Sequence, residues 1–529
     1  MELLKNNDKM VLKCTYSERL FPKMLNARWN AKHKQWEFSS SIMTYNVIIE
    51  EAKKRNIQLQ VDNDLEEFFE RKIDSLSSFR LKKEFKTKPY KHQKLITEFI
   101  INKKKCFVFA GVGTGKSKAA IDAVTQLYDV KEVKKVLVVC PSSIMWNFGN
   151  EIKIHSYFDY TIISGPLEKR KQLLEDSSTV FDIVNYDILS KLEKEIVKKK
   201  YDMVIFDEIH KCKSRTTSLA NASFKISQSI PIRVGLTGTI ISNNYVDLFM
   251  PYKIIDSTIF GDHYTKFKFR YLVMVDYTIV HFMNTDELKR LVASNSIKFD
   301  IRDVMNNLPS EKHIIKKIKL GKESMKIYKD LKNKMVAEYA LGRVVADNVL
   351  ERILRLSQIT SGFLVDKENN LFNVVSTEKI DALKDLLSEI TEKTAIFCRF
   401  KKSIDLVAEL CDKLGISYYT YDGRTKIKDL YLRYNNDDTM VWIAQLQKSE
   451  GYSIPNARYC IFYELDYSRT NHVQSKGRIL RASGSPHECI FYIYLLAEKT
   501  IDEGVYMTLK NKDFSSEKAL ELVRGLNNE

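Results

Sequence analysis

The chain has 529 residues, of which 44% are hydrophobic and 29% are charged, and this composition excludes a single small domain and a disordered chain. The formal net charge of +17 favours a polyanion such as nucleic acid as a partner, although a solvated lysine-rich surface would give the same excess. The eight cysteines stand singly, without a C-x-x-C pair, so neither a zinc site nor a disulfide framework is expected.

The predicted elements fall into five consecutive segments of an α/β chain. Residues 1–62 are expected to form a small α+β domain, and a charged helical linker follows at 63–87. Over residues 88–256, short β-branched runs alternate with helical segments, which is the pattern of a parallel sheet flanked by helices. Residues 257–375 are expected to form a mainly helical insert, and residues 376–529 a second α/β lobe.

The clearest predicted strands of the first lobe are Cys106–Ala110, Lys135–Cys140, Phe181–Asn185, Asp202–Phe206 and Arg233–Leu236. Those of the second lobe are Thr394–Arg399, Ile416–Tyr421, Met440–Ala444, Tyr459–Tyr463 and Cys489–Leu496.

A glycine-rich loop follows the first of these strands and precedes a predicted helix. Strand, glycine loop and helix in this order are typical of a P-loop, whose backbone N–H groups approach phosphates. In such a loop Lys116 would reach the β- and γ-phosphates of ATP, and the Ser117 hydroxyl would ligate Mg²⁺. The predicted ATP-binding residues are Gly111, Val112, Gly113, Thr114, Gly115, Lys116 and Ser117.

Two carboxylates end the apolar strand that precedes position 207. Asp207 is predicted to hold Mg²⁺ through water, and Glu208 is the candidate general base that activates the attacking water. An Asp-Glu pair after a strand is more often a surface turn. Its combination with the glycine loop is what favours the catalytic interpretation, because nucleotides bind at this edge of parallel sheets.

Two further groups of residues complete the predicted machinery. The hydroxyls of Thr237 and Thr239, at the end of another strand, are expected to bond the carboxylates and relay the nucleotide state. In the second lobe, Gln474, Arg478 and Arg481 are spaced to share one helix face. Arginines that face ATP would stabilise the charge of the transition state, although a basic helix face is usually only solvated.

In chain order, these motifs resemble those of the Swi/Snf-type superfamily 2 DEAD/H-box helicases, from about Lys88 to Tyr506. The resemblance implies two RecA-like lobes, an ATP and Mg²⁺ requirement, and DNA as the partner. It also implies an adenine contact by Gln93 and coupling roles for His210 and Gly451. The residues that it implies in nucleic-acid contacts are Ser142, Ser143, Trp146, Arg399, Phe400 and Ser453.

The N-terminal segment resembles the HARP-like domain of annealing helicases and related phage enzymes, whose tryptophan-containing hairpin engages DNA forks. The resemblance rests on Arg28-Trp29 and on Trp36, with Lys32 and Lys34 between them. On this interpretation Arg28 and the lysines contact phosphates, and the tryptophans contact DNA. A small hairpin with both tryptophans in a local core is an equally weighted alternative.

The leading hypothesis is an ATP-driven DNA motor that moves on DNA and remodels forks or branched DNA. An RNA helicase and a nucleic-acid-binding adaptor with a weak ATPase are the alternatives. A soluble cytoplasmic protein without a membrane segment is expected, with replication or recombination proteins as further partners. Heavy use of Lys, Asn and Ile is typical of a virus or phage with an AT-rich genome.

Overall fold

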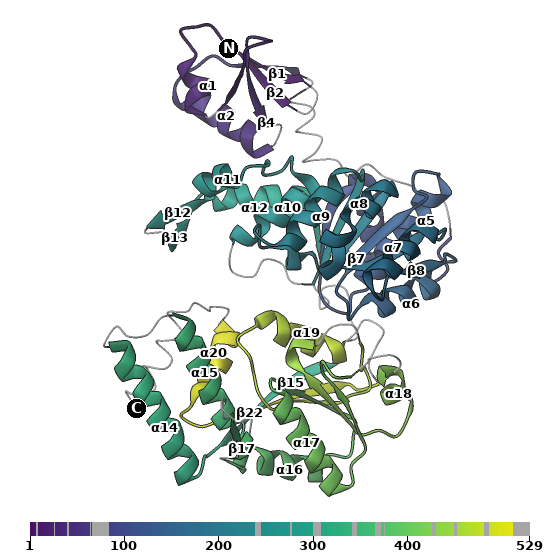
Figure 1. Ribbon diagram of the computed structural model, residues 1–529, viewed down its shortest axis with the longest axis vertical. Coiled ribbons are helices and arrows are strands. Elements are labelled where there is room, and N and C mark those ends of the chain that lie inside the picture. Colours follow the sequence, from purple (N-terminus) through teal and green to yellow (C-terminus); the bar gives the residue numbers. More distant parts are fainter. Residues whose placement is uncertain are drawn as a thin grey trace. The chain divides into compact units, whose positions relative to one another are not determined.

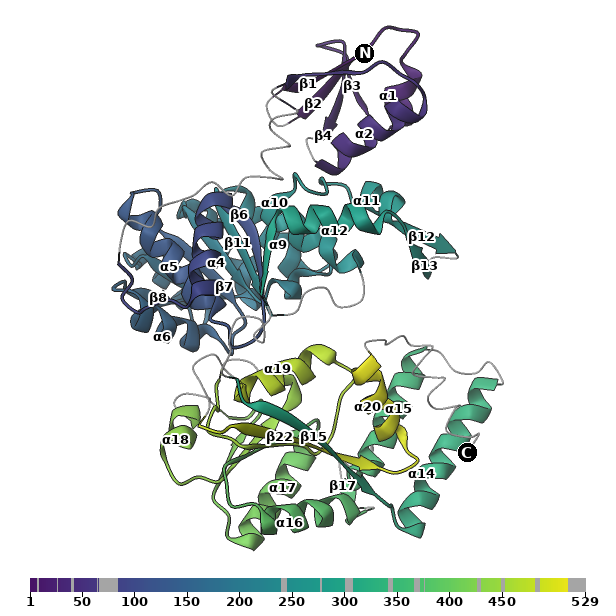
Figure 2. The same ribbon diagram turned by 180° about the vertical axis from the view of Figure 1, so that it is seen from behind.

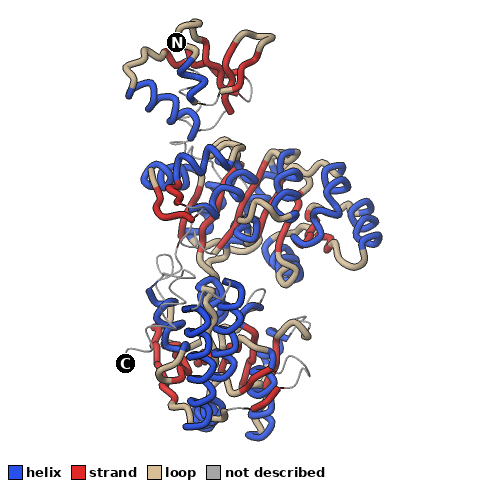
Figure 3. Tube along the Cα trace, turned by 60° about the vertical axis from the view of Figure 1, so that its left-hand side comes forward, coloured by secondary structure: helices blue, strands red, loops and turns tan. Residues whose placement is uncertain are grey.

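The computed structural model describes all residues except 7–8, 26, 40–41, 64, 66–83, 239–244, 276–277, 300–307, 341–345, 366–371, 375, 426–429, 449–451, 481–485 and 512–529. The chain divides into two compact units, Met1–Asp300 and Ile301–Glu529. Figure 3 shows that helices pack around the strands in both units. Most of the predicted linker at 63–87 lies outside the described residues.

The first unit begins with a small α+β domain, as predicted. Its sheet has the strand order β3-β4-β2-β1-β5, with β1 parallel to β5 and the other neighbours antiparallel. The buried side chains of Leu3, Leu12 and Phe38 form part of its core. The elements are β1 (Glu2–Asn6), β2 (Lys9–Lys13), α1 (Leu20–Met24), β3 (Arg28–Asn30), β4 (Gln35–Ser39), α2 (Ile42–Lys54) and β5 (Gln60–Val61).

A seven-stranded parallel sheet follows in the first unit, with the order β14-β6-β11-β10-β7-β9-β8. Its strands are β6 (Lys105–Ala110), β7 (Val136–Cys140), β8 (Tyr160–Ile162), β9 (Phe181–Asn185), β10 (Met203–Asp207), β11 (Ile232–Thr237) and β14 (Ser296–Phe299). The central strands are buried along their whole length because helices cover both faces.

Figures 1 and 2 show the two helical layers of this sheet from opposite sides. Helices α4 (Lys91–Lys103), α5 (Lys116–Asp129) and α6 (Met145–His155) contribute to one hydrophobic core. Helices α7 (Leu167–Asp176), α8 (Leu189–Lys198), α9 (Ser218–Gln228) and α10 (Phe249–Asp256) contribute to the other. Short 3-10 helices are η1 (Tyr186–Ile188), η2 (Ile209–Cys212) and η3 (Tyr245–Leu248).

A helix-hairpin-helix segment closes the first unit before strand β14. It consists of α11 (Tyr264–Tyr271), β12 (Leu272–Val275), β13 (Thr278–Phe282) and α12 (Thr285–Ser294). Strands β12 and β13 pair with each other in a separate two-stranded sheet.

The second unit contains a six-stranded parallel sheet with the order β15-β22-β21-β18-β20-β19. Its strands are β15 (Ser310–Ile318), β18 (Thr394–Cys398), β19 (Tyr418–Tyr421), β20 (Val441–Gln445), β21 (Tyr459–Phe462) and β22 (Cys489–Ala497). Beside it stand the ribbon of β16 (Phe363–Val365) and β17 (Phe372–Val374) and the 3-10 helix η4 (Leu446–Lys448).

The helices of the second unit also form two layers. Helices α16 (Glu378–Glu389) and α17 (Lys401–Leu414) pack in one core. Helices α14 (Lys322–Ala340), α15 (Ala346–Thr360), α19 (Arg469–Ile479) and α20 (Ile501–Asn511) contribute to the other. The described part of this unit also contains helix α18 (Leu430–Asn436).

The ten predicted strands are confirmed, with ends that agree within two residues. The predicted insert at 257–375 differs from the structure, because β14 extends the first sheet and β15 extends the second. Both are edge strands with largely accessible side chains, so they lack the continuous apolar run that marks a buried strand. Among the described residues, no helix has the length and apolar character needed to cross a membrane.

Candidate functional site

The glycine loop joins strand β6 to helix α5 in the first unit. Gly113 and Gly115 have φ angles of +84° and +81°, a region that favours glycine. The Thr114 N–H donates to the Gly111 carbonyl at 3.3 Å, so the loop turns back on itself. Helix α5 begins at Lys116, and its free N–H groups suit a phosphate.

Two side chains from the start of α4 hold this loop. The Gln93 amide donates to the Thr114 carbonyl at 3.0 Å, and His92 Nε2 lies 2.8 Å from the same oxygen. The side-chain oxygen Oε1 of Gln93 accepts the Tyr90 N–H at 3.0 Å, and the Gln93 side chain is buried. Besides its predicted adenine contact, Gln93 therefore links α4 to the phosphate loop. Sequence reasoning missed His92, whose only signal was its place beside Gln93.

The two predicted carboxylates lie buried at the carboxyl end of β10, and the loop lysine reaches one of them. Lys116 Nζ lies 3.5 Å from Glu208 Oε1. Glu208 Oε2 lies 3.2 Å from His210 Nδ1 and accepts a hydrogen bond from the Thr237 hydroxyl at 3.4 Å. Asp207 and Glu208 are 3% and 4% exposed, so water screens these contacts weakly. The first unit thus brings its main predicted catalytic and coupling side chains together.

The backbone of Glu208 is unusual for a residue with a side chain. Its φ of +53° and ψ of +48° are left-handed, and such strained residues concentrate at functional sites. The Glu208 N–H donates to Asp207 Oδ1 at 3.0 Å, and the Tyr186 hydroxyl donates to the Asp207 carbonyl at 3.0 Å. Burial raises the pKa of Tyr186 well above its usual range, so its phenol stays a neutral donor.

The donors at this edge suit a magnesium nucleotide. Among the described residues, no group of three or more His, Cys, Asp or Glu side chains is placed to hold a metal ion alone. Mg²⁺ is usually bound by one or two protein oxygens together with phosphate oxygens and water, and Ser117 and Asp207 could supply the protein oxygens at this edge. Their oxygen atoms are the hard ligands that this ion prefers.

The second unit holds its candidate catalytic residues on α19. Gln474 and Arg478 are buried, and Arg478 donates to the carbonyls of Tyr452 at 3.0 Å and Gln474 at 3.2 Å. The described helix ends at Ile479, and the predicted alignment of Arg481 with these two residues stays a prediction. Arg481, Thr239 and Gly451 lie outside the described residues.

The predicted nucleic-acid contacts of the first unit lie at the turn between β7 and α6. Ser142 is exposed and Ser143 is partly buried in this turn. Trp146, in the first turn of α6, has 52% of its surface exposed, so its ring is accessible to a ligand.

In the second unit, Arg399 and Phe400 follow strand β18 and precede α17, and a buried acid accepts from the Arg399 backbone. Glu464 accepts the Arg399 N–H at 2.6 Å and the Ser403 hydroxyl. Burial raises the pKa of Glu464. Sequence reasoning missed this residue, whose only signal was an acidic side chain after an apolar strand. Ser453 is partly buried, and its carbonyl accepts from an asparagine amide at 2.9 Å.

The N-terminal tryptophans have different environments. Trp29 on β3 and Trp36 on β4 face each other, with ring centroids 5.0 Å apart. Trp36 is only 9% exposed, whereas Trp29 is 47% exposed. The burial of Trp36 argues against its predicted DNA contact and supports the local-core alternative for that residue. Trp29 remains accessible, beside the exposed side chain of Arg28.

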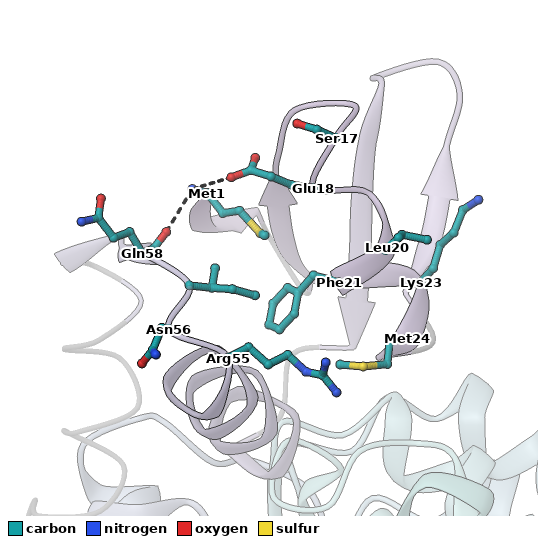
Figure 4. A pocket seen from close by; sticks show the side chains of 11 residues that line it. Met1, Ser17, Glu18, Leu20, Phe21, Lys23, Met24, Arg55, Asn56 and Gln58 are labelled. Carbon is teal, nitrogen blue, oxygen red and sulfur yellow. Dashed lines mark hydrogen bonds and ion pairs between the residues drawn. The ribbon is translucent and has the colours of Figure 1, made fainter.

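A second feature of the N-terminal domain is a hollow of about 930 Å³ (Figure 4). Its lining includes Phe21 and Met24 on α1, and Arg55 and Gln58 after α2. Strand β5 follows these last residues at one edge of the sheet, whereas β3 forms the opposite edge. The hollow is therefore separate from the hairpin that carries Trp29.

Two family descriptions and several known proteins match this chain. The family description "SNF2-related domain" matches residues 8–362, and "Helicase conserved C-terminal domain" matches residues 378–483. An "Uncharacterized ATP-dependent helicase" of Mycoplasma pneumoniae is 23% identical over 74% of this chain and 38% of its own. "DNA repair and recombination protein RAD54B" of Homo sapiens is 22% identical over 75% of this chain and 50% of its own.

A phage protein and a solved structure are also similar. "Putative protein p41" of Acyrthosiphon pisum secondary endosymbiont phage 1 is 24% identical over 58% of this chain and 70% of its own. The Sulfolobus solfataricus SWI2/SNF2 ATPase core in complex with dsDNA has a TM-score of 0.43 and 18% identity, over 84% of this chain and 97% of that one. This chain spans half or less of the Mycoplasma and human relatives. The SNF2-related match covers more than half of the chain, and the chain therefore belongs to the SNF2-related family.

Proposed function

We propose that this protein is an ATP-hydrolysing motor that moves on DNA. The observation that carries the proposal is the contact of Lys116 with Glu208 at one sheet edge, where His210 and Thr237 also meet that carboxylate. ATP hydrolysis that powers movement needs a lysine that binds the phosphates and a general base that activates water. It also needs a link from that base to the neighbouring strand. Two of the relatives are named as a helicase and a recombination protein.

Each candidate catalytic residue of the first unit has a distinct role in the proposed cycle of ATP hydrolysis. Lys116 binds the phosphates, while Ser117 and Asp207 would hold Mg²⁺, which neutralises charge on the phosphates. Glu208 orients and deprotonates the attacking water. Because Lys116 contacts Glu208, phosphate binding competes for the lysine and releases the carboxylate for its role as base.

The coupling and DNA-binding residues extend this cycle. His210 and Thr237 bond each other at 3.1 Å and both meet Glu208, so a change at the carboxylate reaches the end of β11. Arg478 is proposed as an arginine finger. Ser142, Trp146, Arg399 and their neighbours would contact the DNA backbone, so binding should be salt-sensitive and nearly sequence-independent.

The N-terminal domain is proposed to direct the motor to forked or branched DNA. The accessible face of Trp29 can stack on a base, and the exposed Arg28 can contact a phosphate. Lys32 and Lys34, in the turn between β3 and β4, add exposed positive charge next to them.

The test is ATP turnover with and without duplex DNA. Lys116→Ala and Glu208→Gln should each lower DNA-stimulated turnover at least about a hundredfold, since each removes a group that acts in the chemical step. Lys194→Ala and Glu175→Gln change exposed residues of the same types and should leave turnover unchanged. Turnover that survives both active-site changes, with folding intact, would refute the assignment.

Matched nucleic acids separate this proposal from its alternatives. A DNA motor should respond to duplex DNA more strongly than to RNA of the same sequence. Stronger stimulation by RNA would indicate an RNA helicase. Tight ATP binding without turnover on any nucleic acid would indicate an adaptor.

A further inference from the structure

The hairpin of β12 and β13 projects from the first unit, away from the seven-stranded sheet (Figures 1 and 2). None of the roles assigned above uses it. A two-stranded hairpin is marginally stable by itself, so its root must be fixed by other contacts. At that root Leu272 pairs with Phe282, and the Met283 N–H donates to the Tyr271 carbonyl at 2.9 Å.

Helix α12 holds the root of the hairpin firmly. Glu287, in the first turn of α12, accepts the Arg270 Nε–H at 3.0 Å and the Tyr271 hydroxyl at 3.1 Å. The Asn284 amide donates to the Arg270 carbonyl at 2.8 Å. The Phe282 ring packs edge-on against Tyr245, with centroids 5.1 Å apart. The base of the hairpin is therefore anchored by packing, charge and hydrogen bonds.

The distal part of the hairpin exposes apolar side chains. Val273 pairs with His281 and Met274 pairs with Ile279, so Val280 is the extra residue of a β-bulge. Bulges re-aim a side chain, and Val280 is 58% exposed. Val275, on the other strand, is 56% exposed. Water is a poor environment for two valines on a projecting element.

The segment that carries these valines has a small excess of basic residues. Between residues 264 and 290 there are five lysines and arginines and three aspartates and glutamates, of which Asp276 directly follows Val275. The acidic side chains of α12 are also engaged, since Glu287 binds Arg270 and Asp286 lies 3.6 Å from Lys289. Arg290 and His281 are exposed. Basic groups around an apolar projection suit DNA, whose phosphates meet the charges and whose bases meet the apolar atoms.

We propose that the β12–β13 hairpin is a wedge that separates base pairs at a DNA junction. Val275 and Val280 would pack against the last base pair while the motor draws the duplex past the anchored hairpin. Apolar side chains that enter between bases unstack them. The proposal rests on the proposed motor function and goes beyond it, because it assigns strand separation to residues outside the ATP site.

The test compares three activities of the full chain: ATP turnover, displacement of a triplex-forming strand as a measure of movement, and separation of a forked duplex. In Val275→Ser/Val280→Ser, turnover and triplex displacement should stay within about twofold, whereas fork separation should fall at least about tenfold, because hydroxyls replace the apolar contact with the bases. Fluorescence of 2-aminopurine at the fork should lose its protein-dependent increase in this variant.

Two controls make the result specific. Val275→Ile/Val280→Ile keeps the apolar surface and should keep fork separation. Val197→Ser changes a valine on α8 that is 38% exposed and should alter none of the three activities. Both serine variants should unfold at the wild-type temperature.

The outcomes separate the wedge from the motor. Fork separation unchanged by the double serine variant would overturn the wedge and would fit a hairpin that docks a protein instead. A proportional loss of all three activities would also overturn it. A wild-type protein that moves on DNA without separating strands defeats the wedge alone, whereas absence of DNA-stimulated turnover defeats the motor proposal itself.

Discussion

The phosphate loop depends on the absence of a side chain at Gly115. A Cβ atom there would lie 2.2 Å from Gln93 Nε2, and the φ of +81° would be strained for alanine. In Gly115→Ala we expect Gln93 to be displaced from the Thr114 carbonyl and ATP affinity to fall at least about tenfold, because the N–H groups of the loop lose their arrangement. Titration with a fluorescent ATP analogue measures this.

A matched control is available at Gly423, where an added Cβ would meet nothing within 4 Å. Gly423→Ala should bind the analogue with wild-type affinity. Wild-type affinity in Gly115→Ala would contradict the proposed dependence on this glycine.

The phosphate-binding role of this loop could be predicted from the sequence, because few other kinds of site place a glycine-rich loop between a strand and a helix. The contacts of its residues could not. The pairing of Lys116 with Glu208 and the bond from His92 to Thr114 join positions far apart in sequence. Only the folded register of the parallel strands brings such positions together.

The hairpin of β3 and β4 should determine whether the motor prefers forks. Trp29 offers an accessible aromatic face there, and base stacking on such a face contributes about 1–3 kcal/mol. In Trp29→Ala we expect affinity for a forked duplex to fall about fivefold or more, with affinity for a linear duplex little changed. Fluorescence anisotropy with both DNAs at one salt concentration measures the ratio.

Tyr16 provides the control for the hairpin. Its ring is 80% exposed in the same domain, and it contacts Arg19 in the segment between β2 and α1. Tyr16→Ala should keep the fork preference. An equal loss of fork and linear binding in Trp29→Ala would argue against recognition of forks by the hairpin.

Helices and strands with strong hydrophobic periodicity could be predicted from the sequence. The residues at which they end, and which of their side chains are buried, could not. The spacing of Gln474 and Arg478 fitted one helix face, and both lie on α19, but the spacing did not indicate that the helix ends at Ile479, where Leu480 takes an extended conformation. Likewise, sequence alone could not decide which tryptophan of the hairpin is buried. The alternation of Trp36 with Phe38 places both in the core, and such a short pattern is ambiguous without the rest of the sheet.

Two compact units carry the candidate machinery, and the sequence indicated this division because two separate series of strands alternate with helices. The boundary between them was less predictable. Strand β15 joins the second sheet beside β22, more than 170 positions later in the chain. Pairing at such a distance leaves no local signal, so the segment before residue 376 could not be assigned to the second lobe.

The last prediction concerns Arg478, which belongs to the second unit, whereas the candidate ATP-binding residues belong to the first. The first unit holds the phosphate loop and both carboxylates, so it should bind ATP whether or not Arg478 is present. Arg478→Lys keeps a positive charge but loses the planar guanidinium, which an arginine finger needs. We expect affinity for the ATP analogue to stay within about threefold while DNA-stimulated turnover falls about a thousandfold.

The control for this prediction is Arg424→Lys. Arg424 is half-exposed, pairs with Asp405 and Asp422, and has no role in the proposed cycle. Because Arg478 also bonds the Tyr452 carbonyl, its replacement could loosen α19, and thermal unfolding of both variants distinguishes this effect. Turnover that persists in a folded Arg478→Lys protein would remove Arg478 from the chemical step and leave it as a support for α19.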